Sequence, residues 1–170
     1  SKAFTVNNGV LAVSGVPSGV LWTKDDFRNF ELSLEYRFPP GRLVSQQGSG
    51  VIVRTSRDNQ LRDLVEVQLE PSGDSDASGA VWLGREARLD TGRTSSQFPL
   101  LRPRASAAVD RSLGQWNKMT IRCDGPNIVV ILNDAIVISG RNANQFAAPV
   151  GLRSQGTAIQ FLNIKLRELN

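Results

Sequence analysis

The residues with the clearest chemical potential lie in residues 64–70, LVEVQLE, where polar and apolar side chains alternate. Glu66, Gln68 and Glu70 are two residues apart, so a β-strand would place all three on one face. Paired carboxylates serve glycosidases as acid, base or nucleophile, and a retaining pair stands about 5–5.5 Å apart. Glu66 is therefore a candidate acid or base, although the spacing alone is more typical of a solvated strand face. Glu70, beside Pro71, is expected to be exposed.

Charged residues of two other strands could join Glu66. Arg54 ends the β-branched run of residues 49–54, SGVIVR, and by alternation shares a face with Ile52. Its guanidinium could hold a sugar hydroxyl or an enolate oxygen, or form an ion pair with Glu66 or Glu35. Glu35 and Arg37 share the polar face of their own strand. If that strand adjoins the Glu66 strand, the charges form one concave cluster; otherwise the two residues are a surface pair.

Three further residue types have both a chemical and a structural interpretation. Trp82 could stack against a sugar ring, or belong to the core. Asp74 and Asp76 could bind calcium through oxygen ligands, but their spacing fits no complete loop motif and is more typical of a polar turn. Cys123 alternates with Ile121 and is expected to be a buried apolar residue. We therefore predict no metal or cofactor site, with calcium as a weakly supported possibility.

Composition excludes several classes of protein. The 170 residues contain no histidine and one cysteine, which excludes Ser-His-Asp hydrolases, Cys-His proteases, the usual zinc sites and an internal disulfide. The net charge of +4 comes with dispersed arginines and few aromatics, so we expect no nucleic-acid partner. No apolar run approaches the roughly 20 residues of a membrane helix. No signal peptide is visible either.

The elements that must position these residues are β-strands. Residues 30–38 alternate strictly between apolar and polar side chains, and Pro39-Pro40-Gly41 ends the run. Asn133-Asp134 separates two apolar runs and predicts a tight hairpin. No helical period persists over eleven residues. The pattern predicts an all-β sandwich or jelly roll in one domain, residues 1–170, and residues 84–115 are expected to form a long irregular segment at one rim of it.

Several short motifs occur in a recognisable order along the chain. They are residues 9–11 (GVL), 19–24 (GVLWTK), 27–32 (FRNFEL), 35–37 (EYR), 49–54 (SGVIVR), 65–68 (VEVQ), 115–117 (QWN), 132–134 (LND), 150–152 (VGL) and 161–164 (FLNI). Together they resemble the 3-keto-disaccharide hydrolase domain family over nearly the whole length. The chain departs from the family pattern at Gly48, where asparagine is usual, and at Arg153 and Gln155, where glutamine and histidine are usual.

The resemblance implies a concanavalin A-like jelly roll of two curved antiparallel sheets, with a concave face that holds sugar. It also implies a hydrolase of 3-keto disaccharides or glycosides in a secreted or periplasmic protein. Glu66 would remove the proton at C2, and Arg54 or Arg153 would stabilise the enolate. Glu35, Arg37, Gln68, Trp82, Arg153 and Gln155 would contact the sugar. Because the family histidine is absent, a non-catalytic carbohydrate-binding module or an interaction domain of a larger surface protein remains an alternative.

Overall fold

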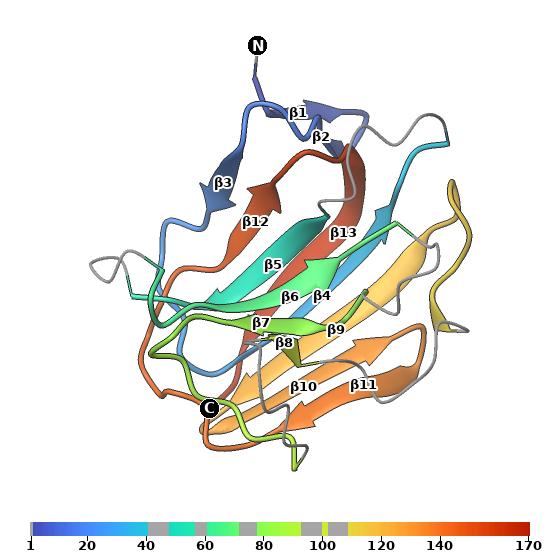
Figure 1. The fold of residues 1–170 in the computed structure, drawn as a ribbon. Coiled ribbons are helices and arrows are strands. Elements are labelled where there is room, and N and C mark those ends of the chain that lie inside the picture. The colour runs from blue at the N-terminus through green and yellow to red at the C-terminus, as the bar shows by residue number, and fades with distance from the viewer. Residues whose placement is uncertain (1, 41–47, 57–60, 72–77, 93–99, 102–108) are drawn as a thin grey trace.

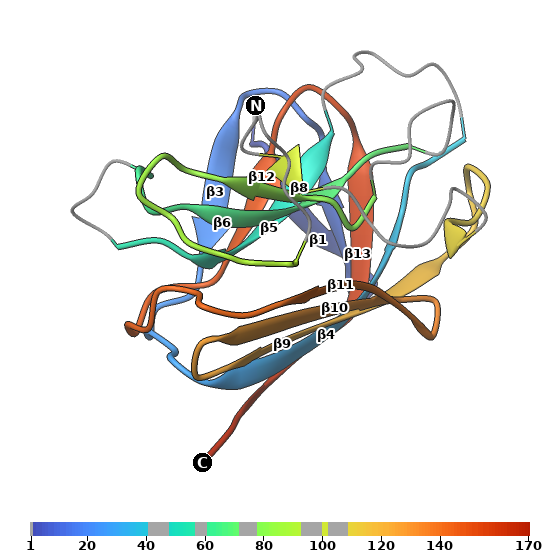
Figure 2. The same ribbon diagram turned by 60° about the horizontal axis from the view of Figure 1, so that its bottom comes forward.

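Two antiparallel β-sheets pack face to face in the computed structural model (Figure 1). The structure describes residues 2–40, 48–56, 61–71, 78–92, 100–101 and 109–170. Over these residues it contains strands and turns and no α-helix, which confirms the predicted all-β sandwich. Figure 2 shows the two layers almost edge-on, with β4, β9, β10 and β11 in one layer and β3, β12, β5 and β6 in the other.

The part of the chain that the structure describes forms thirteen strands in the two sheets. The seven-stranded sheet contains, in spatial order, β1 (Phe4–Asn7), β2 (Val10–Val13), β13 (Ile159–Glu168), β4 (Phe30–Arg37), β9 (Asn117–Asp124), β10 (Asn127–Leu132) and β11 (Ala135–Gly140). The six-stranded sheet contains β3 (Gly19–Trp22), β12 (Gly151–Ser154), β5 (Ser49–Arg54), β6 (Val65–Leu69), β7 (Val81–Leu83) and β8 (Leu100–Leu101). All neighbouring strands are antiparallel.

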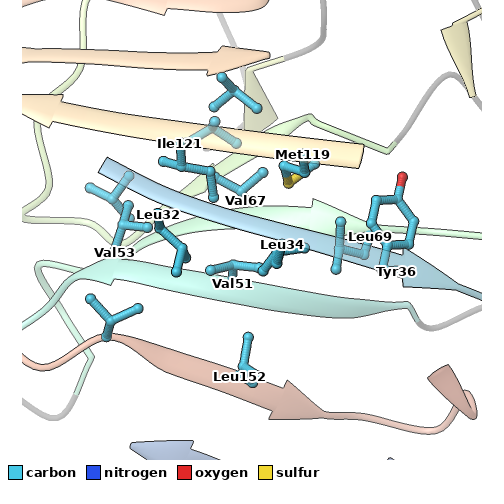
Figure 3. Close-up of a cluster of buried hydrophobic side chains, with 14 of the residues drawn as sticks. Leu32, Leu34, Tyr36, Val51, Val53, Val67, Leu69, Met119, Ile121 and Leu152 are labelled. Atoms are coloured by element: carbon cyan, nitrogen blue, oxygen red, sulfur yellow. The ribbon is translucent and has the colours of Figure 1, made fainter. Parts of the chain in front are cut away.

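Alternation along the strands builds the core between the sheets. In β4 every second side chain, from Phe30 to Tyr36, is buried, and the residues between them are partly exposed. Figure 3 shows Leu32 and Leu34 of this strand packed among Val51, Val67 and Ile121 from both sheets. Burying an aliphatic side chain of this size stabilises the fold by about 1.5–3 kcal/mol. The core therefore fixes which side chains point outward from each sheet.

The predicted tight hairpin at Asn133-Asp134 is present. Asn133 and Asp134 have φ angles of 46° and 67° and connect β10 to β11, as a two-residue hairpin of the type favoured by strand twist requires. Within residues 84–115, Leu100–Leu101 form the short edge strand β8, so the segment is not irregular throughout. Residues 93–99 and 102–108 of the same segment lie outside the described residues, so the expected irregular structure is not tested there.

Candidate functional site

Two rows of paired residues cross the outer face of the six-stranded sheet. In one row, Arg153 of β12 pairs with Gly50 of β5, which pairs with Gln68 of β6. In the other, Ile52 of β5 pairs with Glu66, and Glu66 pairs with Trp82 of β7. Directly paired residues share a face of the sheet. Since Val51 and Val67 between these rows point into the core, both rows point outward.

Gly50 provides the space that the Glu66 carboxylate occupies. A Cβ atom at Gly50 would lie 2.0 Å from Glu66 Oε1 and 2.7 Å from Cδ, so no other residue fits there without displacing the carboxylate. By crossing β5 above this glycine, Glu66 reaches β12, where Arg153 lies 3.1 Å from Oε2. The two charged groups meet across an intervening strand because that strand has no side chain between them.

The Glu66–Arg153 pair is largely withdrawn from water. The side chains are 2% and 19% exposed. Burial raises the pKa of Glu66 above its ordinary value, and the charge of Arg153 and the side chain of Gln68 oppose that rise. Glu66 Oε1 and Arg153 Nε are buried and have no hydrogen-bond partner among the described residues. An unsatisfied acceptor and an unsatisfied donor thus lie on the same buried pair of side chains.

Other predicted contact residues surround this pair. Arg153 donates a hydrogen bond to Gln155 Oε1 at 3.4 Å, and Gln68 lies in the same row as Arg153. Trp82, paired with Glu66, is 41% exposed, so it is not a core residue and its ring is accessible. The structure therefore brings Glu66, Gln68, Trp82, Arg153 and Gln155 together, as predicted, while their roles in binding or catalysis stay predictions.

Glu35 and Arg37 do not join this group. Both lie on β4, which belongs to the seven-stranded sheet, so the predicted shared cleft with Glu66 is wrong. Glu35 accepts a hydrogen bond from Asn163 at 2.9 Å. Arg37 donates one to Gln160 at 2.7 Å and covers the ring of Trp116. The chain crosses from one sheet to the other between β4 and β5, and the alternation within each strand carries no sign of that crossing.

Arg54 is also placed differently from the prediction. The pairing of β5 with β6 shifts between Ile52 and Arg54, so Arg54 pairs with the core residue Val65 instead of sharing a face with Ile52. The side chain is fully buried, and its guanidinium donates hydrogen bonds to the carbonyl oxygens of Phe146 and Gly125 at 2.7 and 3.4 Å. The bulge turns Arg54 inward. Arg54 therefore connects the segments around Phe146 and Gly125. The arginine that pairs with Glu66 is Arg153.

Arg54 also contacts Cys123, which is buried as predicted. Burial raises the pKa of this thiol to about 12, against an opposing effect of the Arg54 charge. The cysteine is therefore protonated at neutral pH and behaves as a core residue.

Sequence reasoning missed two residues of this face. Gly50 stands inside a β-branched strand, and a glycine in that position is a known signal of close approach by another group. Trp22 of β3 is the second, and it pairs with Gly151 on the outward row that contains Ile52. A Cβ at Gly151 would lie 2.7 Å from the indole ring, so this second glycine gives the ring its place over the sheet.

Asp74 and Asp76, which we expect to form a polar turn and which offer only weak support for a calcium site, lie outside the described residues. Within the described ranges, no group of three or more acidic or cysteine side chains is arranged to hold a metal ion. No helix of the described chain is long and apolar enough to cross a membrane.

Comparisons with known proteins agree with this architecture. Residues 1–167 match the family described as the 3-keto-alpha-glucoside-1,2-lyase-like domain. A proposed glycosyl hydrolase from Parabacteroides distasonis has 25% sequence identity and a TM-score of 0.68, over 98% of this chain and 90% of that one. A search of curated proteins finds no match.

Two more distant structures share the fold. The carbohydrate-binding module CBM66 from Bacillus subtilis has a TM-score of 0.66 at 10% identity, over 97% of this chain and 91% of that one. The Bacillus licheniformis β-glucanase has a TM-score of 0.59 at 10% identity, over 99% of this chain and 82% of that one. These likenesses confirm the predicted concanavalin A-like jelly roll.

Proposed function

Because the chain belongs to the 3-keto-alpha-glucoside-1,2-lyase-like domain family, we propose that it cleaves 3-keto glycosides at the Glu66–Arg153 pair. The observation that carries the proposal is the buried carboxylate whose Oε1 has no partner, beside an arginine whose Nε has none. A general base needs a free lone pair, and an enolate needs a donor close to that base. Both are present on the two side chains of one ion pair.

The reaction follows from the ketone of the substrate. A carbonyl at C3 acidifies the proton on C2, and Glu66 Oε1 accepts that proton. The electron pair forms an enolate whose oxygen is stabilised by the Arg153 guanidinium. The enolate then expels the oxygen at C1, which leaves as an alcohol after taking up a proton, and a C1–C2 double bond remains. Addition of water across that bond gives the hydrolysed sugar, so no histidine is required.

Burial of Glu66 helps this role. A base works best when its pKa approaches the working pH, and burial moves the pKa of Glu66 in that direction. The carboxylate must be ionised to accept a proton. Activity should therefore rise with pH through the raised pKa of Glu66, and the acid limb of the pH–rate profile should lie above the ordinary range of a glutamate.

The test compares two glutamate-to-glutamine variants on a 3-keto glucoside. Glu66→Gln keeps the shape and removes the base, so we expect turnover to fall by about a hundredfold or more, the usual contribution of general base catalysis. Glu35→Gln, on the opposite sheet, is the matched control and should retain full turnover. Undiminished turnover in Glu66→Gln would show that Glu66 is not the base.

The second candidate function is carbohydrate binding without catalysis. The likeness of the fold to CBM66 supports it, and the chain has no histidine. Under this function the open Oε1 and Nε atoms would bind sugar hydroxyls, and Trp82 would stack on the ring. Saturable binding of a glucoside, weakened by Trp82→Ala, together with absence of turnover on the 3-keto substrate, would favour it.

A further inference from the structure

A second candidate site lies on the opposite side of the sandwich. It is an open cavity of about 480 Å³ on the outer face of the seven-stranded sheet. It lies at the edge formed by β11, the last strand of that sheet in Figure 1. We call this cavity the Asp90 pocket, and the side chains that line it include those of Asp90, Thr91, Asn127, Val129, Ser139 and Arg141. Ligand pockets usually measure about 300–1,000 Å³. The cavity is therefore large enough for a small ligand, and it shares no residue with the Glu66 face.

The wall of this pocket is held in place by the fold itself. Asp90 and Arg141 exchange two backbone hydrogen bonds, of 2.7 and 2.9 Å, which attach residues 89–92 to the end of β11. Leu89 anchors the same segment in the core by packing over Gly140, where a Cβ would lie 2.5 Å from the leucine side chain. The Asp90 carboxylate accepts a hydrogen bond of 2.8 Å from the backbone amide of Gly92. The pocket is preformed in the way that small-molecule sites usually are.

The charges of the pocket cancel. Arg141 Nε lies 3.4 Å from Asp90 Oδ2. The Gly92 amide, and to a lesser degree Arg141, lower the pKa of Asp90, so the carboxylate is ionised at neutral pH. An anionic ligand would be attracted by Arg141 and repelled by Asp90, and a cationic ligand the reverse. The pair therefore offers no net attraction to a charged ligand of either sign, and hydrogen bonding decides what the pocket holds.

The remaining groups suit a ligand with many hydroxyls. Asn127 offers an amide, and Thr91 and Ser139 offer hydroxyls, each able to donate and accept. Val129 points outward between them, paired with Ser139, and provides an apolar floor. A pyranose ring has the same combination of peripheral hydroxyls and an apolar C–H face. The mixture matches a neutral sugar better than a nucleotide, a peptide terminus or a metal ion.

We propose that the Asp90 pocket is a second carbohydrate-binding site, selective for neutral sugar units and independent of the Glu66 face. Because the two sites are on outer faces of opposite sheets, one disaccharide cannot contact both. The pocket would hold a separate sugar or another part of a long glycan, and its occupation does not depend on whether Glu66 is catalytic.

Amide chemical shifts measured by NMR during titration with cellobiose and maltose test the proposal, with glucuronate as the charged comparator. We expect saturable shifts at Thr91, Val129 and Ser139 at millimolar neutral sugar, unchanged in Glu66→Gln and smaller with glucuronate. Ser139→Tyr should fill the cavity and weaken binding at least tenfold. Ser33→Tyr, at an outward position of β4 in the same sheet, is the matched control and should bind normally.

Absence of saturable shifts at these amides with both sugars would overturn the proposal, as would equal binding of the sugars by Ser139→Tyr and the unsubstituted chain. Equal affinity for glucuronate would overturn the selectivity for neutral ligands. If Ser139→Tyr lost its native spectrum, Asn127→Ala would replace it, with an expected weakening of about fivefold for one lost hydrogen bond.

Discussion

The outer faces of the two sheets carry the same kind of charge pair in opposite environments. On the seven-stranded sheet, Glu31 lies 3.6 Å from Arg122 and 3.2 Å from Arg167, and all three side chains are at least 31% exposed. On the six-stranded sheet, Glu66 and Arg153 are buried. Exposed pairs contribute between zero and about 1 kcal/mol to stability. Burying a pair is costly, so the second arrangement calls for a reason other than stability.

A glycine accounts for much of the difference. Next to Glu31 the neighbouring strands present side chains, Arg122 and Arg167 among them, and the carboxylate stays at the surface. Next to Glu66, Gly50 has no side chain, so the Glu66 carboxylate packs against the backbone of β5. Two carboxylates that alternation places alike therefore differ chemically, because the adjacent strand leaves space for one of them and not for the other.

Removing the cation from the buried pair should have the largest effect. Arg153→Gln takes away the proposed enolate donor, so turnover on a 3-keto glucoside should fall about 10²–10³-fold, as for other oxyanion donors. It also removes a charge that lowers the pKa of Glu66, so the acid limb of the pH–rate profile should move to higher pH. Arg37→Gln on the other sheet should change neither. An unmoved acid limb in Arg153→Gln would contradict the coupling.

Filling the space above β5 should have the next largest effect. The Cβ of Gly50→Ala would meet the Glu66 carboxylate at 2.0 Å and displace it, and a misplacement of about 1 Å can cost a hundredfold in rate. Gly19→Ala is the matched control, because Gly19 belongs to the same sheet and a Cβ at that position would have no atom within 4 Å. Kinetics of both variants decide the point. Equal rates in the two would mean that the glycine does not set the position of the base.

The same two faces show what the sequence can and cannot reveal. Alternation correctly places Glu66 and Gln68 on one face of their strand, because a strand has a period of two residues. It fails for Arg54, since one extra residue in a bulge reverses the face of everything that follows in the strand. It fails for Glu35 because the partners of β4 are β13 and β9, whose residues lie far along the chain. Register and sheet membership depend on long-range packing, which a local pattern does not encode.

The pH dependence of stability distinguishes burial from attraction at Glu66. Burial raises the pKa of Glu66, so the folded protein holds this proton more tightly than the unfolded chain does. As pH rises from the ordinary glutamate range through the raised value, the original protein should lose stability relative to Glu66→Gln, and the loss should be complete above the raised pKa. Urea unfolding of both proteins over this pH range measures the difference. A change of the opposite sign would mean that Arg153 outweighs burial.

The smallest effect should come from the exposed pair. Glu31→Gln removes the carboxylate that faces Arg122 and Arg167, but all these groups are solvated and held by flexible side chains. We expect the free energy of unfolding to fall by less than about 1 kcal/mol, and by less still in high salt, where mobile ions screen the charges. Turnover should not change, since the pair lies on the opposite sheet from Glu66. Unfolding measured at low and high ionic strength tests this directly. A loss well above 1 kcal/mol that persisted in high salt would show that exposure to solvent does not make the Glu31 pair weak, and that burial is not what distinguishes the energetics of the two pairs.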